Sequence, residues 1–261
     1  MRISVITVKG SDYAYRILNY ARHINLPIHS VLVIDYSFVK KISLIKSMYV
    51  RKLGYIGAIP IIVQRIIKEM KRLINKQWNG KEFIRDYKLL AENVLYTNDE
   101  NNPEFIECVR SLEPDLLLLG QIGIIRKNIL SIPKMAIINA HAGWLPEYRG
   151  NDVIYWTIYF KEFDKIGCTI HYVDEGADTG NIIKFVPCPP VQGDTISKLI
   201  DRIYDESAKA LVEMAMKLSE GVVEGYSQSK ESGRTYYAMP LSLCQYAENN
   251  LQKYLINNKT S

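Results

Sequence analysis

The sequence predicts an α/β fold built around a mostly parallel sheet. Short runs rich in Val, Ile and Leu alternate with stretches in which apolar residues recur at helical spacing. Turn-forming Gly, Asn, Asp or Ser residues lie at or just after the ends of these runs. Because strands that alternate with helices form parallel sheets covered on both faces, we expect a layered core of helices around a sheet.

Five buried strands and three principal helices are expected along the chain. The strands cover Ile3–Val8, 27–36, 114–120, 134–139 and 167–173. The helices begin near residue 12, at a cap formed by Asp194, and near residue 241. The second of these helices is long, and Gly221 ends it because glycine readily adopts the conformations that stop a helix.

The composition indicates one large globular domain with a small appendage. Of the 261 residues, 48% are hydrophobic and 23% are charged, a balance that supports a folded core. We expect a main domain at residues 1–205. Residues 206–261 are expected to hold the end of the long helix and a short tail with a hairpin and a helix.

Positive charge is concentrated in one segment. Residues 37–90 contain 13 Lys or Arg against three Asp or Glu, whereas the whole chain carries a formal charge of +5. We interpret this segment as a solvated helical insertion, broken into two helices near Gly54, Gly57 and Pro60. Contact with phosphate groups or peripheral contact with an anionic membrane surface is the alternative. The modest net charge does not indicate a nucleic-acid-binding protein.

The chain has the sequence features of a cytoplasmic protein. Its N-terminal apolar run ends at Lys9 and lacks the cleavage site of a signal peptide. The most apolar later stretch, 53–67, is too short to span a bilayer and contains Gln64 and Arg65. The four cysteines are widely separated and show no metal-binding spacing, so we expect reduced structural thiols.

The segment 137–183 carries the residues best suited to catalysis. Asn139 and His141 have one residue between them at the end of an expected strand, so both side chains point to the same side. Active sites of parallel α/β folds lie beyond the carboxyl ends of the strands, where these two residues stand. Asp178 follows the next expected strand in a loop between Gly176 and Gly180, and its carboxylate can approach the imidazole.

These three residue types suit the attack of an amine on a formyl carbon. The attack creates an oxyanion that needs a hydrogen-bond donor, and the amine must lose a proton. Asn139 and His141 can meet these needs, while Asp178 can orient the imidazole and pass protons through water. Taken singly, each residue also has a structural interpretation, such as a turn former or a loop histidine. For His171, a supporting role in the core and a role in the site stay equally open.

The same segment resembles the folate-dependent formyltransferase family, which includes glycinamide ribonucleotide, methionyl-tRNA and nucleotide-sugar formyltransferases. The matching elements are Asn139-x-His141, Leu145-Pro146, Arg149-Gly150, Gly167-x-Thr169-x-His171 and Asp178-x-Gly180. The resemblance continues upstream through 116–130 and, more weakly, to residue 1. It departs from the family at Gly143 and Trp144, where serine and leucine are usual. It implies a Rossmann-like core followed by a short C-terminal tail.

The resemblance also implies the roles of individual residues in a catalytic domain at 1–205. Asn139, His141 and Asp178 would be catalytic, with 10-formyltetrahydrofolate as the formyl donor and no metal. The pterin of the donor would lie against two segments, formed by Gly120, Gln121, Ile122, Gly123 and Ile125 and by Asp174, Glu175, Gly176 and Ala177. The expected substrate contacts are Tyr148, Arg149 and Gly150. The Leu145–Pro146 peptide bond is expected to be cis.

A nucleotide-linked amino sugar is the acceptor that we expect. The loop at Gly10 lacks the glycine-rich phosphate cradle of the glycinamide ribonucleotide enzymes. About forty residues follow Gly221, too few for the tRNA-binding domain of the methionyl-tRNA enzymes. Tyr236 and Tyr237 in the tail can stack on a nucleobase.

Four alternative functions stay open. Within the same family they are a methionyl-tRNA formyltransferase, a glycinamide ribonucleotide formyltransferase and a formyltetrahydrofolate hydrolase, in which water replaces the amine. A different class is a non-catalytic protein that binds folate or a protein partner through the basic segment. A homodimer is compatible with each of these functions, and nucleic acid is not an expected partner.

Overall fold

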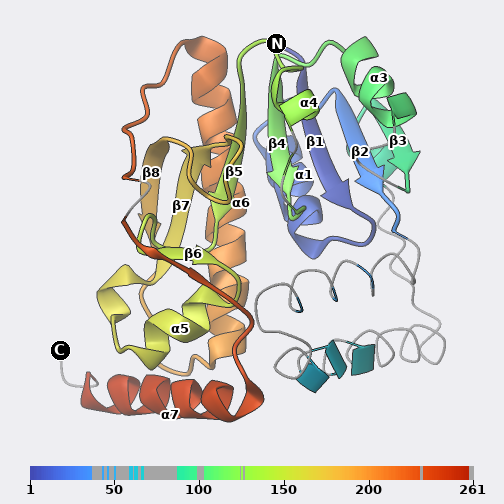
Figure 1. Ribbon diagram of the computed structural model, residues 1–261. Coiled ribbons are helices and arrows are strands. Elements are labelled where there is room, and N and C mark those ends of the chain that lie inside the picture. Colours follow the sequence, from blue (N-terminus) through green and yellow to red (C-terminus); the bar gives the residue numbers. More distant parts are fainter. Residues whose placement is uncertain are drawn as a thin grey trace.

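A seven-stranded sheet forms the centre of the protein in the computed structural model (Figure 1). The structure describes residues 1–36, 87–98, 103–123, 125, 127–229 and 232–258, with isolated positions between 43 and 67. Side by side, the strands are β3 (Asn93–Thr97), β2 (Ser30–Ile34), β1 (Ile3–Val8), β4 (Leu116–Gly120), β5 (Ala136–His141), β7 (Gly167–Tyr172) and β8 (Ile182–Pro187). The first five are parallel, and β7 and β8 are antiparallel to their neighbours. The predicted fold class, an α/β core with a mostly parallel sheet, is confirmed.

The five predicted strands are present, and their ends differ from the expected ones by at most three residues. Two edge strands, β3 and β8, were not predicted. Their side chains are only partly buried, and Tyr96 of β3 is 56% exposed. An edge strand covered on one face lacks the continuous apolar run that identifies a central strand of a parallel sheet.

Helices cover both faces of the sheet. On one face lie α1 (Asp12–His23) and α6 (Ile196–Glu220), and on the other lie α3 (Pro103–Ser111) and α4 (Lys127–Leu130). Alternate residues of β1 pack into the hydrophobic clusters on the two faces of the sheet. Ile3 and Val5 pack with α1 and α6, whereas Ile6 packs with α3. The long helix α6 runs across the predicted domain boundary at residue 205.

The starts of the two long helices on the first face follow capping chemistry. Ser11 caps α1, since its side chain accepts a hydrogen bond from the backbone N–H of Ala14. Thr195 caps α6 in the same way, so the prediction that Asp194 is the cap is wrong by one residue. Asp194 instead accepts a hydrogen bond from the backbone N–H of Val191 and pairs with Arg202. Gly221 ends α6 as predicted.

A second, smaller layer lies beside the antiparallel part of the sheet. It contains α5 (Val153–Tyr159), the 3-10 turn η2 (Phe163–Lys165), α7 (Leu241–Asn257) and the two-stranded sheet of β6 (Tyr148–Gly150) and β9 (Arg234–Tyr236). The tail was expected to contain a hairpin. In the described residues its strand β9 pairs in parallel with β6, so the tail returns to the segment that follows β5. The predicted last helix is present as α7.

The basic segment 37–90 lies mostly outside the described residues, as do Gly54 and Gly57. Its described end is the 3-10 turn η1 (Tyr87–Leu89), which precedes β3. Two described positions, Val50 and Ile62, pack against Ala238 of the tail. Among the described helices, none combines the length and apolar character needed to cross a membrane.

One guanidinium links α1 to α6. Arg16 contacts the carboxylates of Asp12, Asp201 and Asp205 at 2.5 to 2.8 Å, and its side chain is only 19% exposed. Burial opposes the charge of Arg16, but the hydrogen bonds that it donates to these carboxylates outweigh this effect and raise the pKa of the guanidinium. A partly buried network of this kind stabilises more than an isolated surface pair.

We therefore expect Arg16→Ala to lower the free energy of unfolding by about 2 kcal/mol, because three carboxylates lose their common partner. Urea denaturation followed by circular dichroism measures this change. Arg22→Ala, at an exposed position of the same helix, is the matched control. Equal losses in the two variants would show that the network does not hold α1 against α6.

Candidate active site

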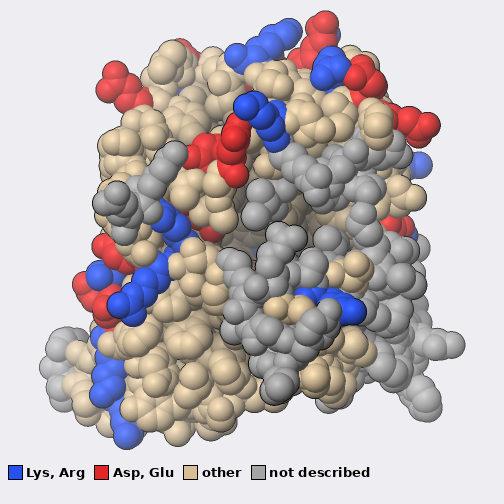
Figure 2. Space-filling view, in the orientation of Figure 1, with Lys and Arg blue, Asp and Glu red and all other residues tan. Residues whose placement is uncertain are grey.

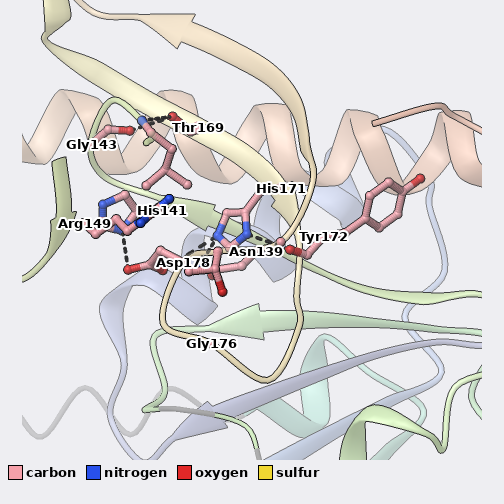
Figure 3. Close-up of polar contacts among 12 residues, drawn as sticks. Asn139, His141, Gly143, Arg149, Thr169, His171, Tyr172, Gly176 and Asp178 are labelled. Atoms are coloured by element: carbon pink, nitrogen blue, oxygen red, sulfur yellow. Dashed lines mark hydrogen bonds and ion pairs between the residues drawn. The ribbon is translucent and has the colours of Figure 1, made fainter. Parts of the chain in front are cut away.

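The end of β5 places Asn139 and His141 on one side of the sheet, as their spacing predicted. In the antiparallel pairing with β7, Asn139 lies opposite His171 and His141 lies opposite Thr169. Figure 3 shows the side chains of Asn139, His141, His171 and Asp178 directed toward one another. The structure thus brings together the three predicted catalytic residues and His171.

The imidazole of His141 lies between a backbone carbonyl and a carboxylate. Its Nε2 is 2.7 Å from the carbonyl oxygen of Tyr148, and its Nδ1 is 3.5 Å from Oδ2 of Asp178. A carbonyl only accepts hydrogen bonds, so Nε2 carries a proton and donates it to Tyr148. The residue is 8% exposed. Gly143 permits this contact, since a Cβ there would lie 2.7 Å from Nε2.

Asp178 is held in its loop by backbone contacts. Its Oδ2 accepts a hydrogen bond of 3.3 Å from the backbone N–H of Gly150, and its φ of 57° lies in the left-handed region. Asp tolerates this region better than most residues, although it still costs of order 1 kcal/mol. In the same loop, Asp174 accepts hydrogen bonds from the backbone N–H of Gly176 and the hydroxyl of Thr179. The loop therefore has a defined shape around the carboxylate.

His171 orients the carboxamide of Asn139. Its Nδ1 is 2.7 Å from the carbonyl oxygen of Tyr172 and therefore carries the proton, so Nε2 accepts from Nδ2 of Asn139 at 3.2 Å. The ring is 2% exposed, and this burial lowers its pKa in spite of the nearby Asp178. A neutral His171 keeps the acceptor that fixes Asn139. These contacts place His171 beside the candidate site, next to Asn139.

The turn after β5 is attached to β7 through Thr169. Its hydroxyl donates to the carbonyl of Gly143 at 2.7 Å and accepts from the backbone N–H of Leu145 at 3.1 Å. The Leu145–Pro146 peptide bond is cis, as predicted. Trp144 stacks on Phe185 of β8 with a ring separation of 4.4 Å.

The two segments expected at the pterin lie next to each other. Gly120 ends β4, Gln121 has a φ of 66°, and Ile125 is buried with the core around α3. The second segment follows β7, and an ion pair of 3.3 Å between Lys127 and Glu175 joins the two. Exposed residues lie on both sides of this contact, at Gln121 and Gly123 and at 175–177.

The three expected substrate residues form β6, and each contacts a different part of the site. The backbone of Gly150 binds Asp178, and the carbonyl of Tyr148 binds His141. The ring of Tyr148 is buried against Tyr236, and burial together with Glu162 raises its pKa. Arg149 is also buried, at 6% exposure, and is not at an open mouth of the site.

A cavity of about 330 Å³ lies along β6 and β9. Three aromatic side chains, two carboxylates and two cationic side chains surround it: Tyr148, Phe160, Tyr236, Glu147, Glu162, Lys165 and Arg234, with Gly233. The ring of Tyr148 lines this cavity while its carbonyl contacts His141, so one residue separates the cavity from the candidate catalytic groups.

One polar residue at the site was not predicted from the sequence. Gln228, in the tail, donates hydrogen bonds to the carbonyls of Asp178 and Gly180 at 3.0 and 2.6 Å. Its Oε1 accepts from Arg149 at 2.9 Å. Nothing in the local sequence distinguishes Gln228, since it lies 50 residues from Asp178 in the chain. In the described part of the chain, no three His, Cys, Asp or Glu side chains form a group that could hold a metal ion.

Comparison with known proteins gives both sequence and structural matches. The family model for formyl transferase matches residues 64–215, more than half of the chain. Methionyl-tRNA formyltransferases of Clostridioides difficile and Syntrophus aciditrophicus are 39% identical over 119 residues and 35% identical over 149 residues. These matches cover 45% and 56% of this chain but only 38% and 46% of the relatives. The chain therefore matches less than half the length of either relative.

Solved structures of similar fold cover more of the chain. The N-formyltransferase of Helicobacter canadensis, in complex with folinic acid and dTDP-3-aminofucose, has a TM-score of 0.58 at 16% identity. The match covers 97% of this chain and 82% of that one. Glycinamide ribonucleotide transformylase 1 of Symbiobacterium toebii has a TM-score of 0.57 at 20% identity, over 86% and 91% of the two chains. At these identities the two structures support the fold alone.

The lowered pKa of His171 predicts a pH dependence of stability. The unfolded chain takes up this proton near pH 6.5 and the folded chain only at lower pH, so the free energy of unfolding falls as the pH drops below about 6.5. His171→Gln removes this contribution, which is at most about 1.4 kcal/mol per pH unit. Urea titrations of both proteins between pH 7 and pH 5 measure the difference in slope. Identical slopes would contradict a histidine kept neutral by burial.

Proposed function

Because the chain belongs to the formyl transferase family, we propose that it transfers a formyl group from 10-formyltetrahydrofolate to an amine. The observation that carries the proposal is the arrangement of Asn139, His141 and Asp178 at the carboxyl end of β5. Active sites of parallel α/β sheets lie at this edge.

Each of the three side chains has a distinct task in the proposed reaction. The Nδ2 of Asn139 donates one hydrogen to Nε2 of His171. Its second hydrogen can be donated to the formyl oxygen as negative charge develops there. The Nδ1 of His141 lies 3.5 Å from Oδ2 of Asp178, so the imidazole can orient this carboxylate for proton transfer. The Asp178 side chain is 19% exposed, against 8% for His141, so the carboxylate is the member that can accept the amine proton directly or through water.

The two adjoining loop segments suit the formyl donor. Gln121, Gly123 and 175–177 are exposed and can offer donors and acceptors to the edge of a flat heterocycle, and the partly buried Ile122 can provide apolar contact. When bound, the donor supplies an activated formyl group, so no nucleophilic side chain is required. Residues 120–125 and 174–177 would hold the pterin and orient the formyl carbon toward Asn139.

For the acceptor, we propose a nucleotide-linked amino sugar. The cavity along β6 and β9 supports this choice, because it combines aromatic rings for a nucleobase with Lys165 and Arg234 for phosphate charge. Figure 2 shows Lys and Arg side chains along the side of the molecule that holds β6 and α5. A neighbour that matches 97% of this chain was crystallised with dTDP-3-aminofucose. The backbone carbonyl of Tyr237 accepts a hydrogen bond of 2.7 Å from the indole N–H of Trp156.

A second candidate acceptor is methionyl-tRNA. Methionyl-tRNA formyltransferases are among the sequence relatives, with 39% identity over 119 residues and 35% over 149 residues. The two candidates share the formyl donor and the three catalytic residues, so only the acceptor distinguishes them.

Removing any member of the catalytic trio should abolish most of the activity. We expect Asn139→Ala, His141→Ala and Asp178→Asn each to lower turnover at least about a hundredfold, since each removes charge stabilisation or proton transfer. Release of tetrahydrofolate from the formyl donor, measured spectrophotometrically, gives the rates. His23→Ala and Asp164→Asn, at exposed positions, are matched controls. Near-normal rates in all three site variants would refute the proposed site.

The acceptor can be identified with a defined panel. It contains dTDP-, UDP- and GDP-linked 3-amino and 4-amino sugars, glycinamide ribonucleotide and charged initiator tRNA. We expect formyl transfer to at least one nucleotide sugar and weaker binding of the same sugar without its nucleotide, because base stacking contributes about 1 to 3 kcal/mol. Transfer to tRNA or glycinamide ribonucleotide alone would exclude the nucleotide sugar and keep the formyl-transfer proposal.

A further inference from the structure

We propose that Gln228 is a positioning residue for the candidate catalytic carboxylate, an inference that rests on the proposed role of Asp178. The tail reaches the site by backbone pairing, because Tyr226 exchanges two hydrogen bonds of 2.9 Å with Ile182 at the start of β8. Two residues later, the Gln228 side chain extends over the loop between β7 and β8.

The amide of Gln228 has only one orientation that satisfies its neighbours. Its Nε2 faces the carbonyl oxygens of Asp178 and Gly180, which only accept, and its Oε1 faces the guanidinium of Arg149, which only donates. Arg149 also donates to the carbonyl of Ser229, so the tail backbone and the glutamine side chain share one anchor. The three contacts therefore fix the amide on the loop.

The loop needs this support because the contacts of Asp178 are long. Its Oδ2 is 3.3 Å from the backbone nitrogen of Gly150 and 3.5 Å from Nδ1 of His141, so a small displacement breaks both contacts. The backbone at Asp178 has a positive φ, which the surrounding structure must maintain. Gly180 is pressed against β7, where an added Cβ would lie 1.9 Å from the carbonyl oxygen of Tyr172. Gln228 holds the loop between these two points.

Gln228 lies beyond residues 64–215, the span that matches the family model. The tail thus adds a positioning residue to a site whose candidate catalytic groups all lie inside that span. In this arrangement Gln228 acts through Asp178 and does not itself touch the reacting atoms.

Two substitutions distinguish the contacts made by Nε2 of Gln228 from the contact made by its Oε1. Gln228→Met keeps the length and removes all polar contacts, whereas Gln228→Glu keeps an acceptor for Arg149 and places a carboxylate against the two loop carbonyls. We expect both variants to lower kcat about tenfold with a much smaller change in KM, because misplacement of a catalytic group affects the chemical step. Activity of Gln228→Glu equal to that of the unaltered protein would show that only the contact with Arg149 matters and would overturn the proposal.

A matched control and a second measurement keep the test independent of the acceptor. Gln252→Met removes a similar glutamine, whose Nε2 donates to the carbonyl of Asp194 far from the site, and should leave kcat unchanged. Amide hydrogen exchange should increase at 176–180 in Gln228→Met and not in Gln252→Met. Unchanged exchange at 176–180 overturns the proposal even if no acceptor is formylated. Lack of transfer to every acceptor, with increased exchange, contradicts the proposed function and supports the positioning of the loop.

Discussion

The antiparallel pairing of β5 with β7 is the constraint on which the candidate active site depends. It sets Asn139 opposite His171 and His141 opposite Thr169, so both candidate catalytic residues of β5 have a partner on the neighbouring strand. A slip of one residue would turn these side chains to the other face of the sheet. His171 would no longer orient the carboxamide, and Thr169 would no longer hold the turn at Gly143 and Leu145.

The site combines a rigid half and a half that depends on loops. Asn139 and His141 are carried by the end of β5, whose backbone pairs there with β7, and His171 is carried by β7, which pairs with both β5 and β8. Asp178 is in a connection, where its position depends on side-chain and backbone contacts with β6 and the tail. Sites on strands are held more closely than sites on loops, so the carboxylate is the member most sensitive to distant changes. This division gives the tail a direct connection to the proposed chemistry.

The short strand β6 connects the proposed chemistry to the proposed acceptor cavity. The carbonyl of Tyr148 lies within hydrogen-bonding distance of His141, and the backbone N–H of Gly150 donates to Asp178. The side chain between them, Arg149, donates to Gln228 in the tail. Because β6 also pairs with β9, the wall of the cavity and the catalytic groups share one piece of backbone. The residues of the cavity and the candidate catalytic groups are therefore adjacent along a single strand.

The sequence by itself determined the α/β class, the five central strands and the candidate trio, because these depend on local spacing. A central strand of a parallel sheet has a continuous apolar run, and two side chains of a strand that have one residue between them lie on the same face. The edge strands β3 and β8 were not predicted because several of their residues are exposed or only partly buried, so they lack a continuous apolar run. The tertiary structure alone decided the contacts between distant segments: His171 with Asn139, β9 with β6, and Gln228 with Asp178. These contacts leave no local pattern, since each residue is chosen by a partner tens of positions away in the chain, and only the folded packing brings the pair together.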